Sequence, residues 1–448
     1  MTAPARTAAW HALVAIAGER ADLPSALARS RSQLADERDR ALSAAIVTGT
    51  LRWQRTLDHL IEHFAKRSIA KLDSDVLIIL RESLFQILHL ERVPAAAVVD
   101  DAVNLTRAAK KSSAAGFVNA VLRATLRQRH RLPLPLRPSD PRDRTAAIAY
   151  LGIRYSHPDW LVARWFDRYG LDDAERWVRF NNDPAPLTVR ANRLRLDRDR
   201  LRETFVEAGI ETTPTHFAPD GLMVTSGNPL RSRADGSFLV QDEASQLVAL
   251  TVDAQPGESV LDLCASPGGK TLAMAASMND SGTLVACDVR AGRMALMRDT
   301  IALSGAHHVR LVHVPASGPL PFEPVFDRVL VDAPCSGLGT LRRDPDIKWR
   351  RQEVDLARLA HQQLDLLLRA AALVRPAGRL VYATCSSEPE ENEAIVLRLL
   401  EQSPFQPVDL RRSGPAALAP VLDERGALRT LPFVHGLEAF YGAALVRV

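Results

Sequence analysis

The sequence predicts a multi-domain protein with an all-α N-terminal domain, a small α+β domain and a C-terminal α/β domain. Three observations lead to this expectation. A chain of 448 residues is too long for one ordinary hydrophobic core. The spacing of apolar residues changes from a helical period in the first part to short continuous runs in the last part. A proline-rich tract follows the helical part, and we place the domains at residues 1–132, 145–235 and 236–448.

The N-terminal domain shows the spacing of amphipathic helices throughout residues 6–130. Apolar side chains recur three and four positions apart, for example at Leu77, Leu80, Leu84, Ile87 and Leu88. The tract Leu132–Pro138 then has alternating prolines. Proline lacks a backbone N–H and ends helices, so this tract predicts a semi-rigid linker.

The rest of the chain alternates strands and helices. Helices expected at 158–180 and 199–208, with strands at 187–191 and 221–225, suit an α+β unit of about 80 residues. From Gly236 the pattern becomes strand, loop and helix, repeated, and its apolar strands are typical of a parallel sheet covered on both faces. These strands are expected at 260–263, 283–287, 310–313, 328–331 and 379–384.

The composition, with 46% hydrophobic and 25% charged residues, is typical of a soluble globular protein. The apolar runs are too short to cross a bilayer, and the N-terminus lacks the pattern of a signal peptide. Four cysteines occur without a CxxC pair, which argues against a disulfide framework and against a zinc site. We therefore expect a cytoplasmic protein with no membrane partner and no metal.

The distribution of charge is more informative than the net charge of +4. The stretch from Val103 to Ser139 contains no acidic residue. Its basic residues are Arg107, Lys110, Lys111, Arg123, Arg127, Arg129, Arg131 and Arg137. A solvated helical face is one interpretation of this stretch, and a surface for a polyanionic partner is the other.

The segment 260–271, Val-Leu-Asp-Leu-Cys-Ala-Ser-Pro-Gly-Gly-Lys-Thr, predicts a strand, a tight turn and a helix. Its glycines let the backbone approach a ligand closely. A phosphate-binding P-loop needs glycine where Cys264 stands, and a GxGxxG fingerprint is absent. Asp288 ends the next strand, where a carboxylate accepts hydrogen bonds from ribose hydroxyls. The pattern favours an unphosphorylated nucleoside, such as that of S-adenosylmethionine, over a turn without a ligand.

Cys335 and Cys385 follow two further strands, at the edge where open α/β sheets bind ligands. Cys264 and Cys287 lie in or at the end of apolar strands and are expected to be small core residues. The Ser387–Glu390 pattern predicts a capped helix start beside Cys385, which would favour its thiolate, although inert cysteines also occur at such positions.

A pair of thiols at this edge suits methylation of a pyrimidine at carbon 5. That carbon is a weak nucleophile until a thiolate adds to carbon 6, which is nucleophilic catalysis. A second thiol nearby could assist release of the enzyme after the carbon 5 proton leaves. The carboxylate of Asp332 could hydrogen-bond the edge of the base.

At these residues the chain resembles the RNA cytosine-C5 methyltransferases, and among them the bacterial RsmB/Sun/Fmu subfamily that acts on 16S rRNA. The resemblance covers nearly the whole chain, and helical segments at 39–40, 48–52 and 116–123 resemble a NusB-type RNA-binding domain. The motifs of the catalytic part lie at 261–271, Asp288, 332–349, 383–393 and 431–436.

The resemblance implies a NusB-like helical domain, a ferredoxin- or RRM-like domain and a Rossmann-like methyltransferase domain. It implies S-adenosylmethionine as cofactor, 16S rRNA as partner and a monomer. Cys385 would be the nucleophile, Cys335 would assist product release, and Lys270 and Asp332 would line the site. The residues implied to bind the cofactor are Cys264, Ala265, Ser266, Pro267, Gly268, Gly269, Lys270, Asp288 and Asp332.

Two departures from the family pattern stand out. The stretch 312–318 has no acid near Ala316, where the family has an aspartate that contacts the adenosine. Two outcomes stay open: the cofactor binds more weakly, or Ser317 or a backbone group substitutes for the aspartate. Residues 437–439 read Leu-Glu-Ala in place of Thr-Asp-Gly. Two alternatives stay open: the same chemistry on tRNA, and an RNA-binding assembly or antitermination factor whose catalytic domain has lapsed.

Overall fold

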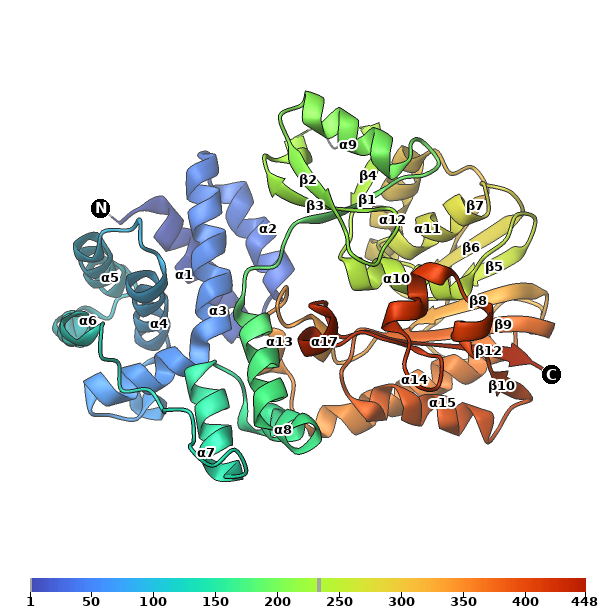
Figure 1. Ribbon diagram of the computed structural model, residues 1–448. Coiled ribbons are helices and arrows are strands. Elements are labelled where there is room, and N and C mark those ends of the chain that lie inside the picture. The colour runs from blue at the N-terminus through green and yellow to red at the C-terminus, as the bar shows by residue number, and fades with distance from the viewer. Residues whose placement is uncertain (1, 232–234) are drawn as a thin grey trace. The chain divides into compact units, whose positions relative to one another are not determined.

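The computed structural model describes residues 2–231 and 235–448, which form two compact units. The helical unit comprises residues 1–183 together with 341–351, and the sheet unit comprises residues 184–340 together with 352–448 (Figure 1). Our three-domain division at residues 132, 145, 235 and 236 stays a prediction. Within the described residues, no helix is long and apolar enough to cross a membrane.

The helical unit is built from antiparallel and crossing helices whose starts are fixed by aspartates. Asp22, Asp36, Asp73 and Asp143 each accept a hydrogen bond from a backbone N–H of the first helical turn, the usual N-cap interaction. The predicted apolar stripe of the fourth helix is confirmed by burial, since Leu80 and Leu84 are inaccessible. The helices are α1 (Pro4–Ala17), α2 (Leu23–Gln33), α3 (Glu37–Ala65), α4 (Ser74–His89), α5 (Ala95–Ala108), α6 (Ala115–Gln128), α7 (Arg144–Ala149), α8 (Asp159–Asn182) and α13 (Ile347–Arg350).

A late segment of the chain, residues 341–351, forms part of the helical unit, and we call it the strap. Lys348 of the strap is only 1% exposed, and its Nζ donates hydrogen bonds to the carbonyl oxygens of Arg52 and Ser156, both at 2.9 Å. The indole of Trp349 donates to the carbonyl oxygen of Leu51 at 2.6 Å. The strap is therefore hydrogen-bonded to α3 and to the turn before α8, although 296 positions separate Lys348 from Arg52.

The sheet unit begins with a small antiparallel sheet in the order β2-β3-β1-β4. Helix α9 (Arg198–Glu207) packs on it through Leu201 and Phe205. The last strand of this sheet follows residue 235, the end that we expected for the α+β domain. The strands are β1 (Thr188–Ala191), β2 (Glu211–Pro214), β3 (Gly221–Ser226) and β4 (Phe238–Val240).

The large sheet has the order β10-β12-β9-β8-β5-β6-β7, with β11 paired to β12. Neighbours from β9 to β7 are parallel, as predicted, whereas β10, β11 and β12 add antiparallel pairings that we did not predict. The strands are β5 (Ser259–Asp262), β6 (Thr283–Asp288), β7 (Val309–His313), β8 (Phe326–Asp332), β9 (Val374–Thr384), β10 (Phe405–Pro407), β11 (Leu428–Arg429) and β12 (Tyr441–Arg447).

Helices cover both faces of the large sheet (Figure 1). One apolar core joins the strands to α14 and α15, and another joins them to α10 and α11. This double cover explains why the central strands are continuous apolar runs. The helices of the sheet unit after α9 are α10 (Glu243–Val252), α11 (Gly269–Ser277), α12 (Ala291–Ser304), α14 (Val354–Ala371), α15 (Glu393–Leu400), α16 (Leu410–Ser413) and α17 (Pro432–His435).

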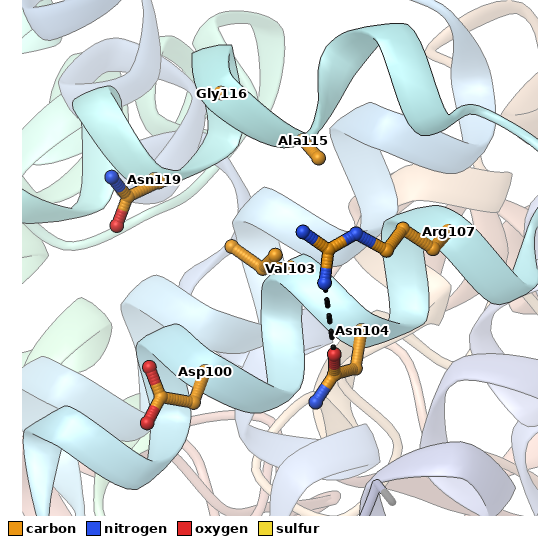
Figure 2. Close-up of a pocket in the computed structure, with 7 residues that line it drawn as sticks. All are labelled: Asp100, Val103, Asn104, Arg107, Ala115, Gly116 and Asn119. Carbon is orange, nitrogen blue, oxygen red and sulfur yellow. Dashed lines mark hydrogen bonds between the residues drawn. The ribbon is translucent and has the colours of Figure 1, made fainter.

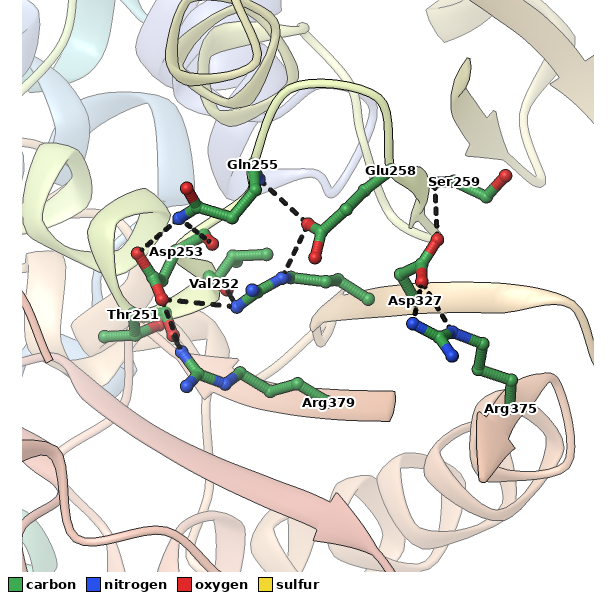
Figure 3. Close-up of polar contacts among 10 residues, drawn as sticks. Thr251, Val252, Asp253, Gln255, Glu258, Ser259, Asp327, Arg375 and Arg379 are labelled. Atoms are coloured by element: carbon green, nitrogen blue, oxygen red, sulfur yellow. Dashed lines mark hydrogen bonds and ion pairs between the residues drawn. The ribbon is translucent and has the colours of Figure 1, made fainter. Parts of the chain in front are cut away.

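Ion pairs hold the amino-terminal ends of the central strands (Figure 3). The Arg328 guanidinium binds Glu258 at 2.7 Å and Asp253 at 3.4 Å, and Arg379 also binds Asp253 at 3.4 Å. Asp327 accepts the backbone N–H of Ser259 at 2.8 Å. These contacts fix the register of β5, β8 and β9, and therefore where their opposite, carboxyl ends lie.

Candidate active site

The carboxyl ends of three neighbouring strands bring the candidate residues together. In the parallel register Asp262 of β5 lies beside Leu330, and Asp332 of β8 lies beside Ala383 of β9. Cys385 and Ser386 directly follow β9, and their loop lies next to the loop that follows Asp332. The parallel sheet thus brings Asp262 and Ala383, which are about 120 positions apart in the chain, to the same edge. Such sheets bind ligands at this edge.

The two candidate thiols are in direct contact, with Cys335 Sγ 3.3 Å from Cys385 Sγ. The hydrogen bond to Cys385, followed by burial, raises the pKa of Cys335 well above its ordinary value. The two thiols thus share one hydrogen bond, in which either sulfur can be the donor. Neither Cys264 nor Cys287 belongs to this pair, and burial raises the pKa of both of these thiols. Cys287 is a buried core residue as expected, whereas Cys264 is only half-buried.

Lys270 and Asp332 form an ion pair with 2.7 Å between Nζ and Oδ2. Burial alone would lower the pKa of Lys270, but the carboxylate of Asp332 outweighs it and the pKa is raised. The ammonium group also donates a hydrogen bond to Ser245 Oγ at 3.0 Å and lies 5.9 Å from the centre of the Phe440 ring. A permanent cation thus holds the carboxylate at the sheet edge.

The loop between β5 and α11 has the geometry of a nucleoside cradle. Gly268 has a φ of +102°, a conformation that side chains rarely adopt, and its N–H donates to the carbonyl oxygen of Ala265 at 2.7 Å. Cys264, Ser266 and Pro267 complete the turn, and Gly269 opens helix α11.

Asp288 ends β6 beside this loop and accepts the backbone N–H of Arg290 at 2.8 Å. The only cation within the loop and first helical turn, Lys270, is occupied by Asp332. An uncharged nucleoside with two hydroxyl groups fits a site with a carboxylate and no free cation. S-adenosylmethionine therefore fits these residues better than a nucleotide does.

The acid-free loop after β7 is held by its backbone. The N–H of Val314 donates to the carbonyl oxygen of Asp288 at 3.3 Å. Arg369 of α14 donates to the carbonyl oxygens of Pro315 at 2.9 Å and Ala316 at 3.0 Å. The loop is thus anchored without an aspartate, and Ser317 lies exposed in it.

A buried glutamate that the sequence analysis missed connects the two cysteine loops. Glu391 is 0% exposed, and its Oε1 accepts the N–H of Ser336 at 2.7 Å and the amide of Gln363 at 2.9 Å. Its Oε2 accepts the hydroxyls of Ser336 and Ser386, each at 2.5 Å. Because these serines directly follow Cys335 and Cys385, the carboxylate fixes the separation of the thiols.

Two further residues were missed. Arg190 of β1 donates to the carbonyl oxygen of Gly269 at 2.7 Å and to the side chain of Gln241, and burial lowers its pKa to about 10. The N–H of Gly339 donates to the carbonyl oxygen of Cys385 at 2.9 Å. A Cβ on Gly339 would lie 1.9 Å from the carbonyl oxygen of Ala439, so glycine is required there.

The helix expected directly after Cys385 begins later than the sequence pattern indicated. Pro389–Glu391 forms a 3₁₀ turn, and α15 begins at Glu393. The expected helix start directly beside Cys385 was therefore wrong, and no helix dipole in the described part of the chain acts on its thiol at close range.

The helical unit also has a polar hollow of about 470 Å³ between α5 and α6 (Figure 2). Arg107 donates to the Asn104 side chain at 3.3 Å across its rim, and Asp100 and Asn119 stand opposite. Gly116 keeps the hollow open, since an added Cβ would meet nothing within 4 Å. Arg107, which belongs to the predicted basic stretch, thus lines a surface hollow and is not packed in the core.

Comparisons with known proteins match all parts of the chain. The family model described as 16S rRNA methyltransferase RsmB/F matches residues 249–446, the NusB family matches 3–127, and a ferredoxin-like domain of RsmF/B-like methyltransferases matches 157–231. These matches confirm the predicted fold classes and their order along the chain.

Relatives of similar length were also found. The probable ribosomal RNA small subunit methyltransferase B of Bacillus subtilis is 33% identical over 416 residues, which cover 92% of this chain and 91% of the relative. The ribosomal RNA small subunit methyltransferase B of Pseudomonas syringae pv. tomato is 33% identical over 455 residues, covering 99% and 97%. The crystal structure of a methyltransferase homolog protein from Pyrococcus horikoshii is 28% identical with a TM-score of 0.57, covering 66% of this chain and 98% of that one.

Proposed function

Because the chain belongs to the RsmB/F family of S-adenosylmethionine-dependent 16S rRNA methyltransferases, we propose that it methylates carbon 5 of a cytosine through a covalent bond from Cys385 to carbon 6. The observation that carries this proposal is the 3.3 Å contact between Cys335 and Cys385 beside the Lys270–Asp332 pair. A methyltransferase acting on a nitrogen or oxygen atom needs no thiol pair, whereas carbon 5 of a pyrimidine must first be activated.

In the first step the Cys385 thiolate adds to carbon 6 of the cytosine. The carbon 5–carbon 6 double bond becomes an electron-rich enamine, which makes carbon 5 a nucleophile. Asp332 hydrogen-bonds the edge of the ring, and Lys270 holds this carboxylate in place through their ion pair. The family's cofactor, when bound, supplies an electrophilic methyl group.

The segment from Cys264 to Lys270, with Asp288 and Asp332, would hold the cofactor. The left-handed turn at Gly268 brings the backbone close, and the Asp288 carboxylate would accept the ribose hydroxyls. Arg190 and Gln241 support the start of α11 from behind through Gly269 and do not touch the ligand.

In the last step the carbon 5 proton passes to water and the electron pair of that carbon–hydrogen bond re-forms the carbon 5–carbon 6 double bond. The carbon–sulfur bond to Cys385 breaks with its electron pair going to sulfur. Cys335 stands in hydrogen-bonding contact with that sulfur, and its raised pKa favours the protonated form, so it would donate a hydrogen bond to the departing thiolate. The proposal thus gives the role of neutral donor to Cys335 and that of nucleophile to Cys385.

The domain plan suits an rRNA substrate. We propose that residues 1–132 bind RNA, that residues 145–235 form the ferredoxin-like domain, and that residues 236–448 carry the chemistry of a cytoplasmic monomer. The intact thiol and ion pairs speak against a lapsed catalytic domain.

Bisulfite sequencing of rRNA from cells with and without the gene tests the proposal. One cytosine of 16S rRNA should lose its methyl group in the deletion and regain it with the wild-type gene. Complementation with Cys385→Ala should fail, while Cys335→Ala should leave a covalent protein–RNA adduct on denaturing gels. Full methylation by Cys385→Ala, or methylation of tRNA instead of 16S rRNA, would contradict the proposal.

A further inference from the structure

A second hollow of the helical unit, of about 510 Å³, combines aromatic rings with arginines. Its aromatic side begins with Trp53 of α3, whose ring stacks on His89 of α4 with 4.7 Å between the ring centres and 20° between the planes. His89 in turn stacks on Phe85 at 5.3 Å and 19°. His89 is exposed and lines the hollow, so this stack of rings reaches the solvent there.

The proline tract that we predicted as a linker forms the wall of this hollow. His59 of α3 hydrogen-bonds the carbonyl oxygen of Pro133 at 2.8 Å, and Arg154 donates to the carbonyl oxygen of Pro135 at 3.4 Å. Leu132, Leu134 and Leu136 line the wall, and Leu136 is 82% exposed. The tract is thus fixed to the helical unit and presents apolar side chains beside the Trp53 stack.

The arginines of this hollow fall into two sets. Arg137 pairs with Glu175 at 2.8 Å and with Asp172, and Arg179 pairs with Glu175 at 2.5 Å. Arg129 donates to His130 Nε2 at 3.0 Å, and Arg154 donates to the carbonyl oxygen of Pro135 at 3.4 Å. Within the described residues, these two arginines therefore keep an uncompensated positive charge beside the rings.

Together these observations lead us to propose that the hollow is a docking site for single-stranded RNA, in which a base stacks at Trp53 and the flanking phosphates bind Arg129 and Arg154. Aromatic platforms beside arginines bind unpaired nucleotides, because every base has a π face and every nucleotide a phosphate. Duplex RNA keeps its bases stacked on one another and cannot enter. The inference rests on the proposed function in that it assumes an RNA substrate.

Binding is measured by fluorescence anisotropy of a labelled single-stranded oligoribonucleotide on the full-length Cys385→Ala chain, in which no covalent bond forms. Trp53→Ala should weaken binding about 10-fold or more, since stacking on one aromatic ring is worth about 1–3 kcal/mol, and Trp53→Phe should restore most of it. Arg129→Ala with Arg154→Ala should lower the slope of log affinity against log salt by about 1.4, as expected for two phosphates of a single strand.

Arg127→Ala is the matched control, because Arg127 lies in the last turn of α6, two positions before Arg129, is exposed and does not line the hollow. It should change the affinity by less than about 2-fold. Far-UV circular dichroism and a thermal melt of each variant show that the helical unit is folded. Unchanged affinity in both Trp53→Ala and the double arginine variant would overturn the inference, as would equal competition by duplex RNA or polyglutamate. Because the assay needs no methyl transfer, it fails independently of the carbon 5 chemistry.

Discussion

Substitution of Glu391 tests how the two thiols are held at their working distance. Glu391→Ala removes the acceptor of four hydrogen bonds that join the loops after β8 and β9. Each hydrogen bond to a buried charge contributes about 1.5–3 kcal/mol, or roughly 6–12 kcal/mol in total. The cost of burying the carboxylate offsets part of this sum, so we expect the free energy of unfolding to fall by about 3–5 kcal/mol.

Glu391→Gln is the matched control, because it keeps the volume and one carbonyl oxygen, and the serine hydroxyls can turn to accept its amide. We expect a loss of about 1–2 kcal/mol for this variant. Urea denaturation followed by circular dichroism gives both values.

A role in positioning the thiols requires a kinetic effect as well. With the loops released, the RNA adduct of Cys385 should persist longer and kcat should fall more than KM rises. The reasoning is refuted if Glu391→Ala unfolds within about 1 kcal/mol of the wild type and resolves its adduct at the normal rate.

Four other variants probe the fold. Gly339→Ala should lower the free energy of unfolding by about 1–3 kcal/mol or more, whereas Gly116→Ala, whose Cβ meets open space, should stay within about 0.5 kcal/mol in the same urea titration. Asp262, whose pKa burial raises to about 7, is protonated in the folded chain between pH 4 and 7 but ionised in the unfolded one. Stability should therefore fall as the pH rises through this window, and Asp262→Asn should fall less steeply; parallel curves would contradict this. Lys348→Met should cost about 2–4 kcal/mol, because it removes two hydrogen bonds donated by a buried ammonium group; a melting temperature equal to that of the wild type would contradict it.

Local patterns predicted most of the fold because the units concerned are local. The central strands of the large sheet lie within a few residues of the predicted ranges, since each is an apolar run bounded by a turn. The antiparallel strand β12 was harder, because its pairing with β9 is decided by residues some 60 positions away in the chain. No local pattern predicts the strap, because Lys348 looks like a surface lysine in the sequence. Its burial depends on partners that are distant in the chain.

The candidate site shows the same division. Lys270, Asp332 and the two cysteines stand out because charged or reactive residues follow apolar strands. Glu391 does not stand out, because it lies among acidic neighbours that sequence reasoning takes for a solvated surface. Only the fold reveals that the loops around Cys335 and Cys385 enclose its carboxylate.

The strap also has a consequence for biosynthesis. Helices α1 to α8 leave the ribosome before residues 341–351 exist, so the hydrogen bonds from Lys348 and Trp349 to Leu51, Arg52 and Ser156 form only later. At about 5–20 residues per second, translation of the 168 residues from 183 to 351 takes roughly 8–34 s. A nascent chain that stalls in this interval carries an incomplete helical unit, and it is then a substrate for proteases and chaperones. Because of this order of synthesis, the helical unit is complete only after most of the sheet unit has been translated.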